Sequence, residues 1–290
     1  MLNTVVQLSV NGIAMGMIYS LLAMGLILLI RAIGVLNFAQ GDLLMLGAFA
    51  TYHLGGPLNL PLIPMLIVSI LFFVVFGALF MFSVYWPVRK SKWPTAAVVC
   101  TIGASMVIKE GAKLIWGGSP LGVDPIVKGY VQIGPTRLEY QYLIIIAVGA
   151  VMIWCIFQLF EKLYSGRLMQ AAAQDPYAAS LLGIPNIITT MVTYMIVMVI
   201  AGMAGYLVAP IFLVSVSLST IQLRAFAGAI IGGFGNLKGA VIGSLLIGLV
   251  ESFSILITST YKDAIVFLVL IIFLIVRPQG IFGDRIADKA

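Results

Sequence analysis

The sequence predicts an all-α fold, a polytopic bundle of transmembrane helices. Hydrophobic residues make up 62% of the 290 residues and charged residues only 9%, and the mean hydropathy is +1.15. Soluble domains are roughly 45–50% apolar, and a soluble fold of this length could not bury so much apolar surface. The apolar residues also form long continuous runs, whereas a transmembrane β-barrel shows alternating segments of about ten residues.

Runs of about 20 apolar residues, the length that crosses the hydrocarbon core, recur along the chain. Six runs qualify or nearly do: 7–30, 63–86, 96–116, 141–160, 186–209 and 263–276. Two further regions are apolar but interrupted, 33–54 by the polar string at 37–42 and 224–257 by the glycine-rich string at 232–239. Counting the first as one span and the second as two gives nine spans, with eight or ten as the alternatives.

The basic residues set the expected orientation. They are scattered at the ends of apolar runs, so the net charge of +6 indicates membrane topology and no nucleic-acid partner. The loop 87–92 carries Arg89, Lys90 and Lys92 and no acid, which places it in the cytoplasm. Nine spans then put the N-terminus outside and the C-terminus inside. We expect one membrane domain over residues 1–290, with its largest external loop at about 117–140.

The sequence contains no evident catalytic or metal-binding constellation. His53 is the only histidine, and the two cysteines lie in separate apolar runs, so no metal site is expected. The sequence also shows no set of a nucleophile, a general base and an orienting group that could form a catalytic site. A phosphate-binding G-x₄-G-K-[ST] loop is also missing, because Lys238 is followed by Gly239. We therefore expect no enzyme activity and no cofactor in this chain, and any ATP and Mg²⁺ must be bound by another subunit.

One alanine-rich, polar stretch, SGRLMQAAAQDPYAASLLGI, interrupts this apolar chain near its middle. Asp175 is a strong helix N-cap, and Pro176 suits the first helical position because its missing N–H would have no partner there. Gly183 can adopt the left-handed conformation that ends a helix, and Ser165 is a candidate cap for a preceding helix. We expect two short cytoplasmic helices within about 161–184, either an ordinary structured loop or a docking element for a soluble partner.

This stretch resembles the cytoplasmic coupling loop of the branched-chain amino acid ABC importer permeases, of the LivH type, a family that also holds urea and sugar permeases. The matching residues are Gly166, Arg167, Ala171, Asp175, Pro176, Ala178, Ala179 and Gly183. Tyr177 and Arg167 are the expected anchors for an ATPase, because interface hot spots favour aromatic and arginine side chains. Ala178 and Ala179 are expected to allow close contact.

The resemblance extends to three further blocks, at about 11–48, 227–251 and 277–283. One departure is the string at 40–42, Gln-Gly-Asp, where the family commonly has His-Gly-Glu. The resemblance implies a LivM-type partner permease, two cytoplasmic ATPase subunits and an external solute-binding protein, in the inner or plasma membrane of a prokaryotic cell. It implies branched-chain amino acids as the solute. A urea or short-amide importer is the alternative within the family, and a self-sufficient secondary transporter or channel is the alternative from another class.

Polar residues inside the apolar runs are candidates for a translocation path, because polar groups at membrane depth must face protein or a water-filled cavity. The candidates are Asn37, Gln40, Asp42, Asn236 and Glu251. For the cluster at 109–113, the preferred interpretation is structural: Lys109 and Lys113 either pair with Glu110 or extend toward the membrane interface. Five glycines at spacings of three and four predict close helix packing along one helix face. They are Gly228, Gly232, Gly235, Gly239 and Gly243.

Overall fold

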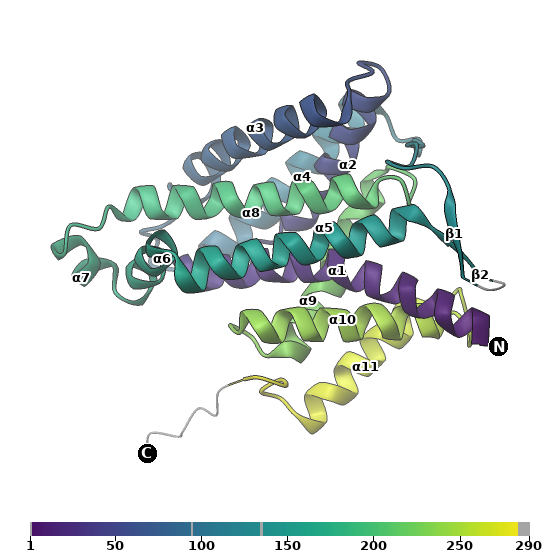
Figure 1. Ribbon diagram of the computed structural model, residues 1–290. Coiled ribbons are helices and arrows are strands. Elements are labelled where there is room, and N and C mark those ends of the chain that lie inside the picture. The colour runs from purple at the N-terminus through teal and green to yellow at the C-terminus, as the bar shows by residue number, and fades with distance from the viewer. Residues whose placement is uncertain (1, 94, 134–135, 284–290) are drawn as a thin grey trace. The chain divides into compact units, whose positions relative to one another are not determined.

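The computed structural model describes residues 2–93, 95–133 and 136–283, and helices dominate this part of the chain (Figure 1). Its internal contacts form two compact units. The terminal unit consists of Met1–Ile27, Ile126–Ile153 and Ile221–Ala290, and the central unit consists of Leu28–Pro125 and Trp154–Thr220. Helices α1 (Leu2–Ile33) and α5 (Tyr140–Phe157) contribute residues to both units. The expectation of a single domain stays a prediction.

The central unit is organised around one long helix, α8. In chain order its elements are α2 (Gln40–Gly55), α3 (Leu62–Phe80), the π-helical turn η1 (Met81–Tyr85), α4 (Ala96–Trp116), the π-helical turn η2 (Gln158–Lys162), α6 (Tyr164–Gln174), α7 (Pro176–Leu181), α8 (Asn186–Val208) and the 3₁₀ turn η3 (Val216–Thr220). Both α2 and α3 pack along α8 (Figure 1). Gly47 of α2 faces Gly202 of α8, and Gly205 of α8 faces Leu44 of α2. The backbones can approach closely because no side chain separates them.

The terminal unit is organised around α10. Besides its parts of α1 and α5, it contains β1 (Tyr130–Ile133), β2 (Thr136–Glu139), α9 (Ile221–Gly232), α10 (Leu237–Ser254) and α11 (Lys262–Val276). Helix α10 packs against α9 and α11, and its Gly248 lies against Gly12 and Gly16 of α1. Ser252 Oγ also donates a hydrogen bond of 2.6 Å to the Leu8 carbonyl oxygen. Small residues and hydroxyl groups therefore hold α1 on α10, as is usual between membrane helices.

Five helical segments among the described residues are long and apolar enough to cross a membrane. They are Asn3–Ile33, Leu62–Tyr85, Tyr140–Lys162, Asn186–Val208 and Leu237–Ser254. The remaining predicted runs are also helical, but α2, α9 and α11 have only 16, 12 and 15 residues. Helix α4 has 21 residues and carries three charged side chains. The multi-span helical class is confirmed at this level, and the count of nine spans stays a prediction.

Both predicted helix breaks are present. The first lies at 34–39, earlier than the predicted string at 37–42, and the second lies at 233–236, within the predicted string at 232–239. Helix α1 ends at Ile33 and α2 begins at Gln40, so Gln40 and Asp42 lie in the first turn of α2. Helix α9 ends at Gly232 and α10 begins at Leu237. The first break lies in the central unit and the second in the terminal unit.

The all-α prediction missed one small β-structure. Strands β1 and β2 form an antiparallel hairpin inside the predicted loop 117–140, with Tyr130 paired with Glu139. The turn residues 134–135 lie outside the described residues. The guanidinium of Arg137 lies 5.0 Å from the centre of the Tyr130 ring, so a cross-strand cation–π contact supports the register. These four-residue strands are too short to produce a clear alternating pattern among the surrounding glycines and prolines.

Candidate functional site

The candidate coupling loop folds as two short helices joined at Asp175, as predicted. The Asp175 backbone is extended (φ −147°, ψ 96°), and its Oδ1 accepts hydrogen bonds from the backbone N–H groups of Tyr177 and Ala178, both at 2.9 Å. Helix α7 therefore begins at Pro176. Gly183 has a φ of +79°, which allows the chain to turn out of α7. The capping predictions for Asp175 and Gly183 are confirmed.

The predicted cap of the preceding helix is wrong. Ser165 lies inside α6, and no side chain caps that helix. Instead, Gln170 Nε2 donates a hydrogen bond of 2.6 Å to the Phe160 carbonyl oxygen. Gly166 lies against the backbone of Leu159 and Phe160, where a side chain would not fit. These contacts attach α6 to the π-helical turn η2, so Gly166 and Gln170 hold the loop in place.

The structure separates the predicted coupling residues into an exposed and a buried set. The exposed residues are Arg167, Ala171, Asp175, Tyr177, Ala178 and Gly183. Gly166 and Ala179 are buried, and Ala179 is only 3% exposed. The expectation that Ala179 lets a partner approach is therefore wrong, because the chain itself already covers this side chain. Pro176 is described by its backbone alone.

Sequence reasoning missed the apolar part of this surface. Tyr164 of α6 and Tyr177, Leu181 and Leu182 of the α7 segment are all strongly exposed, and the exposed fraction of Tyr177 is 74%. We call Tyr164, Arg167, Tyr177, Ala178, Leu181 and Leu182 the α6–α7 surface. Large apolar side chains that gather on an exposed face mark interaction sites. The sequence signal was available, because Leu181 ends a capped helix of six residues and Leu182 follows it, and so short a helix is unable to bury both side chains.

In the central unit, the polar string at the first break is buried. Asn37 and Gln40 are 0% exposed and Asp42 is 1% exposed. Asn37 Oδ1 accepts a hydrogen bond of 3.0 Å from the Ala39 N–H, which closes a local turn before α2. Because the chain's own packing covers these side chains, a path along them requires the surrounding helices to move. Their role in translocation stays a prediction.

Asp42 has a partner that the sequence did not predict. Lys109 Nζ of α4 lies 3.6 Å from Asp42 Oδ1, whereas Lys113 pairs with Glu110 at 2.6 Å on the exposed side of the same helix. The expected pairing with Glu110 is present for Lys113, whereas Lys109 faces Asp42 instead. The buried Asp42 carboxylate thus has a cationic partner, whereas the Glu110 carboxylate is exposed and pairs with Lys113.

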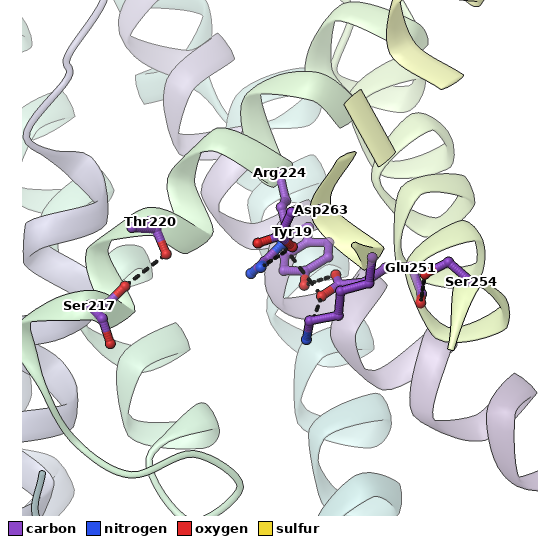
Figure 2. A network of polar contacts seen from close by, with 8 residues as sticks. Tyr19, Ser217, Thr220, Arg224, Glu251, Ser254 and Asp263 are labelled. Carbon is purple, nitrogen blue, oxygen red and sulfur yellow. Dashed lines mark hydrogen bonds and ion pairs between the residues drawn. The ribbon is translucent and has the colours of Figure 1, made fainter. Parts of the chain in front are cut away.

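In the terminal unit, Glu251 is the centre of a buried polar network, shown in Figure 2. The Tyr19 hydroxyl of α1 donates a hydrogen bond to Glu251 Oε2. Glu251 Oε1 lies 3.4 Å from Arg224 Nε and 3.4 Å from Lys262 Nζ. Arg224 Nη2 also donates a hydrogen bond of 2.6 Å to Asp263 Oδ1. One carboxylate thus connects four helices, α1, α9, α10 and α11.

This network contains equal numbers of positive and negative groups, and the exposure of its side chains increases from Glu251 to Asp263. Two carboxylates face one guanidinium and one ammonium group. The Glu251 side chain is 8% exposed and that of Asp263 is 56% exposed, so the network runs from the packed interior to the surface. The sequence identified Glu251 alone, because its partners come from residues far away in the chain and no local spacing relates them. A structural role for Glu251 follows from these contacts, and its place in a path stays a prediction.

Asn236 lies at the second break and serves the local fold. Its Oδ1 accepts a hydrogen bond of 3.1 Å from the Gly239 N–H, which caps α10, and its Nδ2 donates one of 3.3 Å to the Phe282 carbonyl oxygen. The C-terminal tail also supplies a partner for the end of α9, because the Ile281 N–H donates to the Ile231 carbonyl oxygen at 2.8 Å. A helix end leaves its last carbonyl groups without partners in the helix, so this tail completes α9.

The five predicted packing glycines do not share one helix face. Gly228 and Gly232 lie on α9, and Gly239 and Gly243 lie on α10, where they face the first two. Gly235 is in the connecting turn, with a φ of +95° and open space where a side chain would begin. The expectation of close packing is therefore right for four glycines, between two helices. Gly235 provides a left-handed turn instead.

The comparisons with known proteins cover almost the whole chain. A family model described as the permease component of a branched-chain amino acid transport system matches residues 8–274. The chain is 30% identical to the high-affinity branched-chain amino acid transport system permease protein LivH of Escherichia coli (strain K12), over 96% of each chain. It is 26% identical to the corresponding protein BraD of Pseudomonas aeruginosa, over 98% of this chain and 97% of BraD.

More distant similarities were also found. A probable branched-chain amino acid transport permease protein LivH of Methanocaldococcus jannaschii is 27% identical over 91% of this chain and 88% of its own. The solved structure of PsaBC from Streptococcus pneumoniae in complex with Fab covers 92% of this chain and 89% of its own, with a TM-score of 0.48 and 13% identity. A likeness of that degree supports no conclusion about this chain.

Proposed function

Because this chain belongs to the permease family of branched-chain amino acid transport systems, we propose that it forms the translocation path of an ATP-driven importer together with a second permease. The observation that carries the proposal is the α6–α7 surface, a set of exposed aromatic and leucine side chains on α6 and on the capped helix α7. Such a surface fits a soluble partner, and the partner proposed is an ATPase subunit.

The contacts of α6 and α7 supply a route for mechanical coupling. Both helices pack against α8, and α8 in turn packs against α2 and α3. A movement of the ATPase that displaces the α6–α7 surface would therefore displace α8 and its neighbours as a group. We propose that closure of the ATPase pair on ATP rocks these helices between outward-open and inward-open states.

The remaining partners and the solute follow from the family. We propose a LivM-type second permease, two ATPase subunits that bind ATP and Mg²⁺, and an external binding protein that selects the solute. The relatives named above are branched-chain amino acid permeases, and branched-chain amino acids are the solute proposed for this chain. On this proposal the α6–α7 surface is cytoplasmic, the C-terminus is cytoplasmic and the N-terminus is outside.

The test replaces Ala178 by tryptophan in the α6–α7 surface. Ala178 is exposed, so Ala178→Trp should leave folding and insertion intact while it blocks close contact with the ATPase. We expect ATP-dependent leucine uptake into proteoliposomes to be lost and co-purification of the ATPase subunits to weaken. Ser119→Trp is the matched control, because Ser119 is also small and exposed, in the loop 117–140. That variant should keep its ATPase subunits.

Three results would decide against the proposal. Normal uptake and normal co-purification by Ala178→Trp would remove the docking role of the α6–α7 surface. Leucine uptake by the purified chain alone on an ion gradient would identify a secondary transporter. Normal leucine uptake with lost urea uptake, in cells that lack the gene, would identify the urea importer.

A further inference from the structure

The central unit contains an apolar groove that the proposed coupling mechanism does not use. It has a volume of about 470 Å³ and lies between α3 with η1 on one side and α4 on the other, within the range of about 300–1,000 Å³ typical of ligand pockets. Its wall includes Phe76, Leu79, Ser83, Cys100 and Val107. The Ser83 hydroxyl already donates a hydrogen bond of 2.7 Å to the Leu79 carbonyl oxygen, so the groove suits an aliphatic chain.

One end of the groove opens beside a cluster of positive charge. Pro87 and Val88 belong to the wall, and the next residues of the loop include the exposed side chains of Arg89, Lys90 and Lys92. This loop contains no acidic residue. The groove therefore has an apolar wall and a cationic mouth. This arrangement is complementary to an acyl chain joined to an anionic group.

Tryptophan side chains place this mouth at the membrane surface. Arg89 Cζ lies 3.2 Å from the centre of the Trp86 ring, and Arg89 Nη1 donates a hydrogen bond of 2.6 Å to the Trp86 carbonyl oxygen. Trp93 follows the same loop and is 75% exposed. Tryptophan is enriched at the level of the lipid headgroups, and α3 with η1 forms one of the candidate spans. The wall thus extends from the headgroup level toward the hydrocarbon core.

We propose that this groove is a binding site for an anionic phospholipid. One acyl chain lies between α3 and α4, and the phosphate is held by Arg89, Lys90 and Lys92. Basic groups at the ends of membrane helices bind anionic headgroups in this way. A zwitterionic lipid would fill the groove equally well, but its headgroup would gain less from three positive charges.

Cys100 lies in the wall of the groove and can report on its occupancy. The chain has only one other cysteine, Cys155, so Cys155→Ser leaves a single thiol. We expect phosphatidylglycerol, added to the purified transporter in detergent, to slow maleimide labelling of Cys100 at a concentration at least tenfold lower than phosphatidylcholine requires. Inorganic phosphate should give no protection.

Lys90→Gln with Lys92→Gln should remove the preference for phosphatidylglycerol while leaving Arg89 in place against Trp86. The matched control, Lys162→Gln with Lys238→Gln, removes the same charge at two other exposed positions and should keep the preference. Native mass spectrometry of both variants checks that the subunits are folded and assembled. Equal protection by the two lipids would overturn the proposal. Protection of Cys100 in the delipidated transporter would also overturn it, because a protein partner would then cover the groove.

Discussion

Asp175 and Glu251 are both acidic residues that organise helices, but they contribute differently to the free energy of unfolding because only Glu251 is buried. Asp175 is exposed and satisfies two backbone N–H groups at the start of α7, a cap whose removal costs about 1 kcal/mol. Glu251 is buried and has Tyr19, Arg224 and Lys262 as partners. Breaking a buried ion pair on one side costs about 3–5 kcal/mol, because the partner charge stays buried without compensation.

At the residue scale we predict that Glu251→Gln lowers the free energy of unfolding by about 1.5–3 kcal/mol, below the full cost of a broken buried pair, because Arg224 keeps Asp263 as a partner and Lys262 is partly exposed. Asp263→Asn is the control in the same network. Its carboxylate is 56% exposed, so solvent screens the pair and the expected loss is about 0–1 kcal/mol. Denaturant unfolding of both variants in detergent compares the two values. Equal losses would contradict the assignment of Glu251 as the buried centre.

Tyr19 tests a different contact of the same carboxylate. Tyr19→Phe removes only the hydroxyl group that donates to Glu251, and a hydrogen bond to a charged group contributes about 1.5–3 kcal/mol. We expect a loss within that range in the same unfolding assay. Combined with Glu251→Gln, it should add less than it does alone, because the glutamine oxygen still accepts a hydrogen bond from Tyr19 but carries no charge. Full additivity in the double variant would show that the two side chains act independently.

At the scale of the elements, glycine decides which helices can touch. The α9–α10, α1–α10 and α2–α8 contacts all bring glycines of one helix against backbone of another. Helices without a hydrophobic driving force between them associate through such close packing. The close-packed glycines therefore belong to interfaces, whereas Gly111 on α4 has open space where a side chain would begin.

Two alanine substitutions should consequently act with opposite sign. Gly243→Ala would place a methyl group against the backbone of Gly228 and Gly232, and overpacking of this kind costs about 1–3 kcal/mol. Gly111→Ala has no such contact and gains about 0.5–1 kcal/mol from the better helix propensity of alanine. The shift in the melting temperature of each variant measures the difference. Stabilisation by Gly243→Ala would show that α9 and α10 do not pack as described.

At the scale of the whole molecule, the number of spans determines whether the two termini lie on the same side of the membrane or on opposite sides. An odd number places the two termini on opposite sides, and the basic loop 87–92 places the C-terminus inside. We predict that a green fluorescent protein fused to the C-terminus is fluorescent, because it matures only in the cytoplasm. A short tag at the N-terminus should be cleaved by protease added outside spheroplasts. Termini found on the same side would favour eight or ten spans.

Local sequence was sufficient to predict the helices and the cap of α7, although it gave the wrong cap for α6. Each predicted apolar run contains a helix, because continuous hydrophobicity over many residues requires burial in lipid or protein whatever the neighbours are. The Asp175 cap was also predictable, because its donors are two and three residues away. The break before α10 follows from Gly233 and Gly235, which both have positive φ.

Tertiary structure alone decided which side chains are covered and which charges meet. Ala178 and Ala179 are adjacent and identical, yet only Ala179 is buried, because one side of a short helix faces α6 and α8. Tyr19 and Glu251 are 232 positions apart and form one hydrogen bond. Interactions within a helical turn depend on the residues of that turn, so sequence determines them. Contacts between distant helices depend on how close their backbones can approach, and only the packed structure specifies that distance.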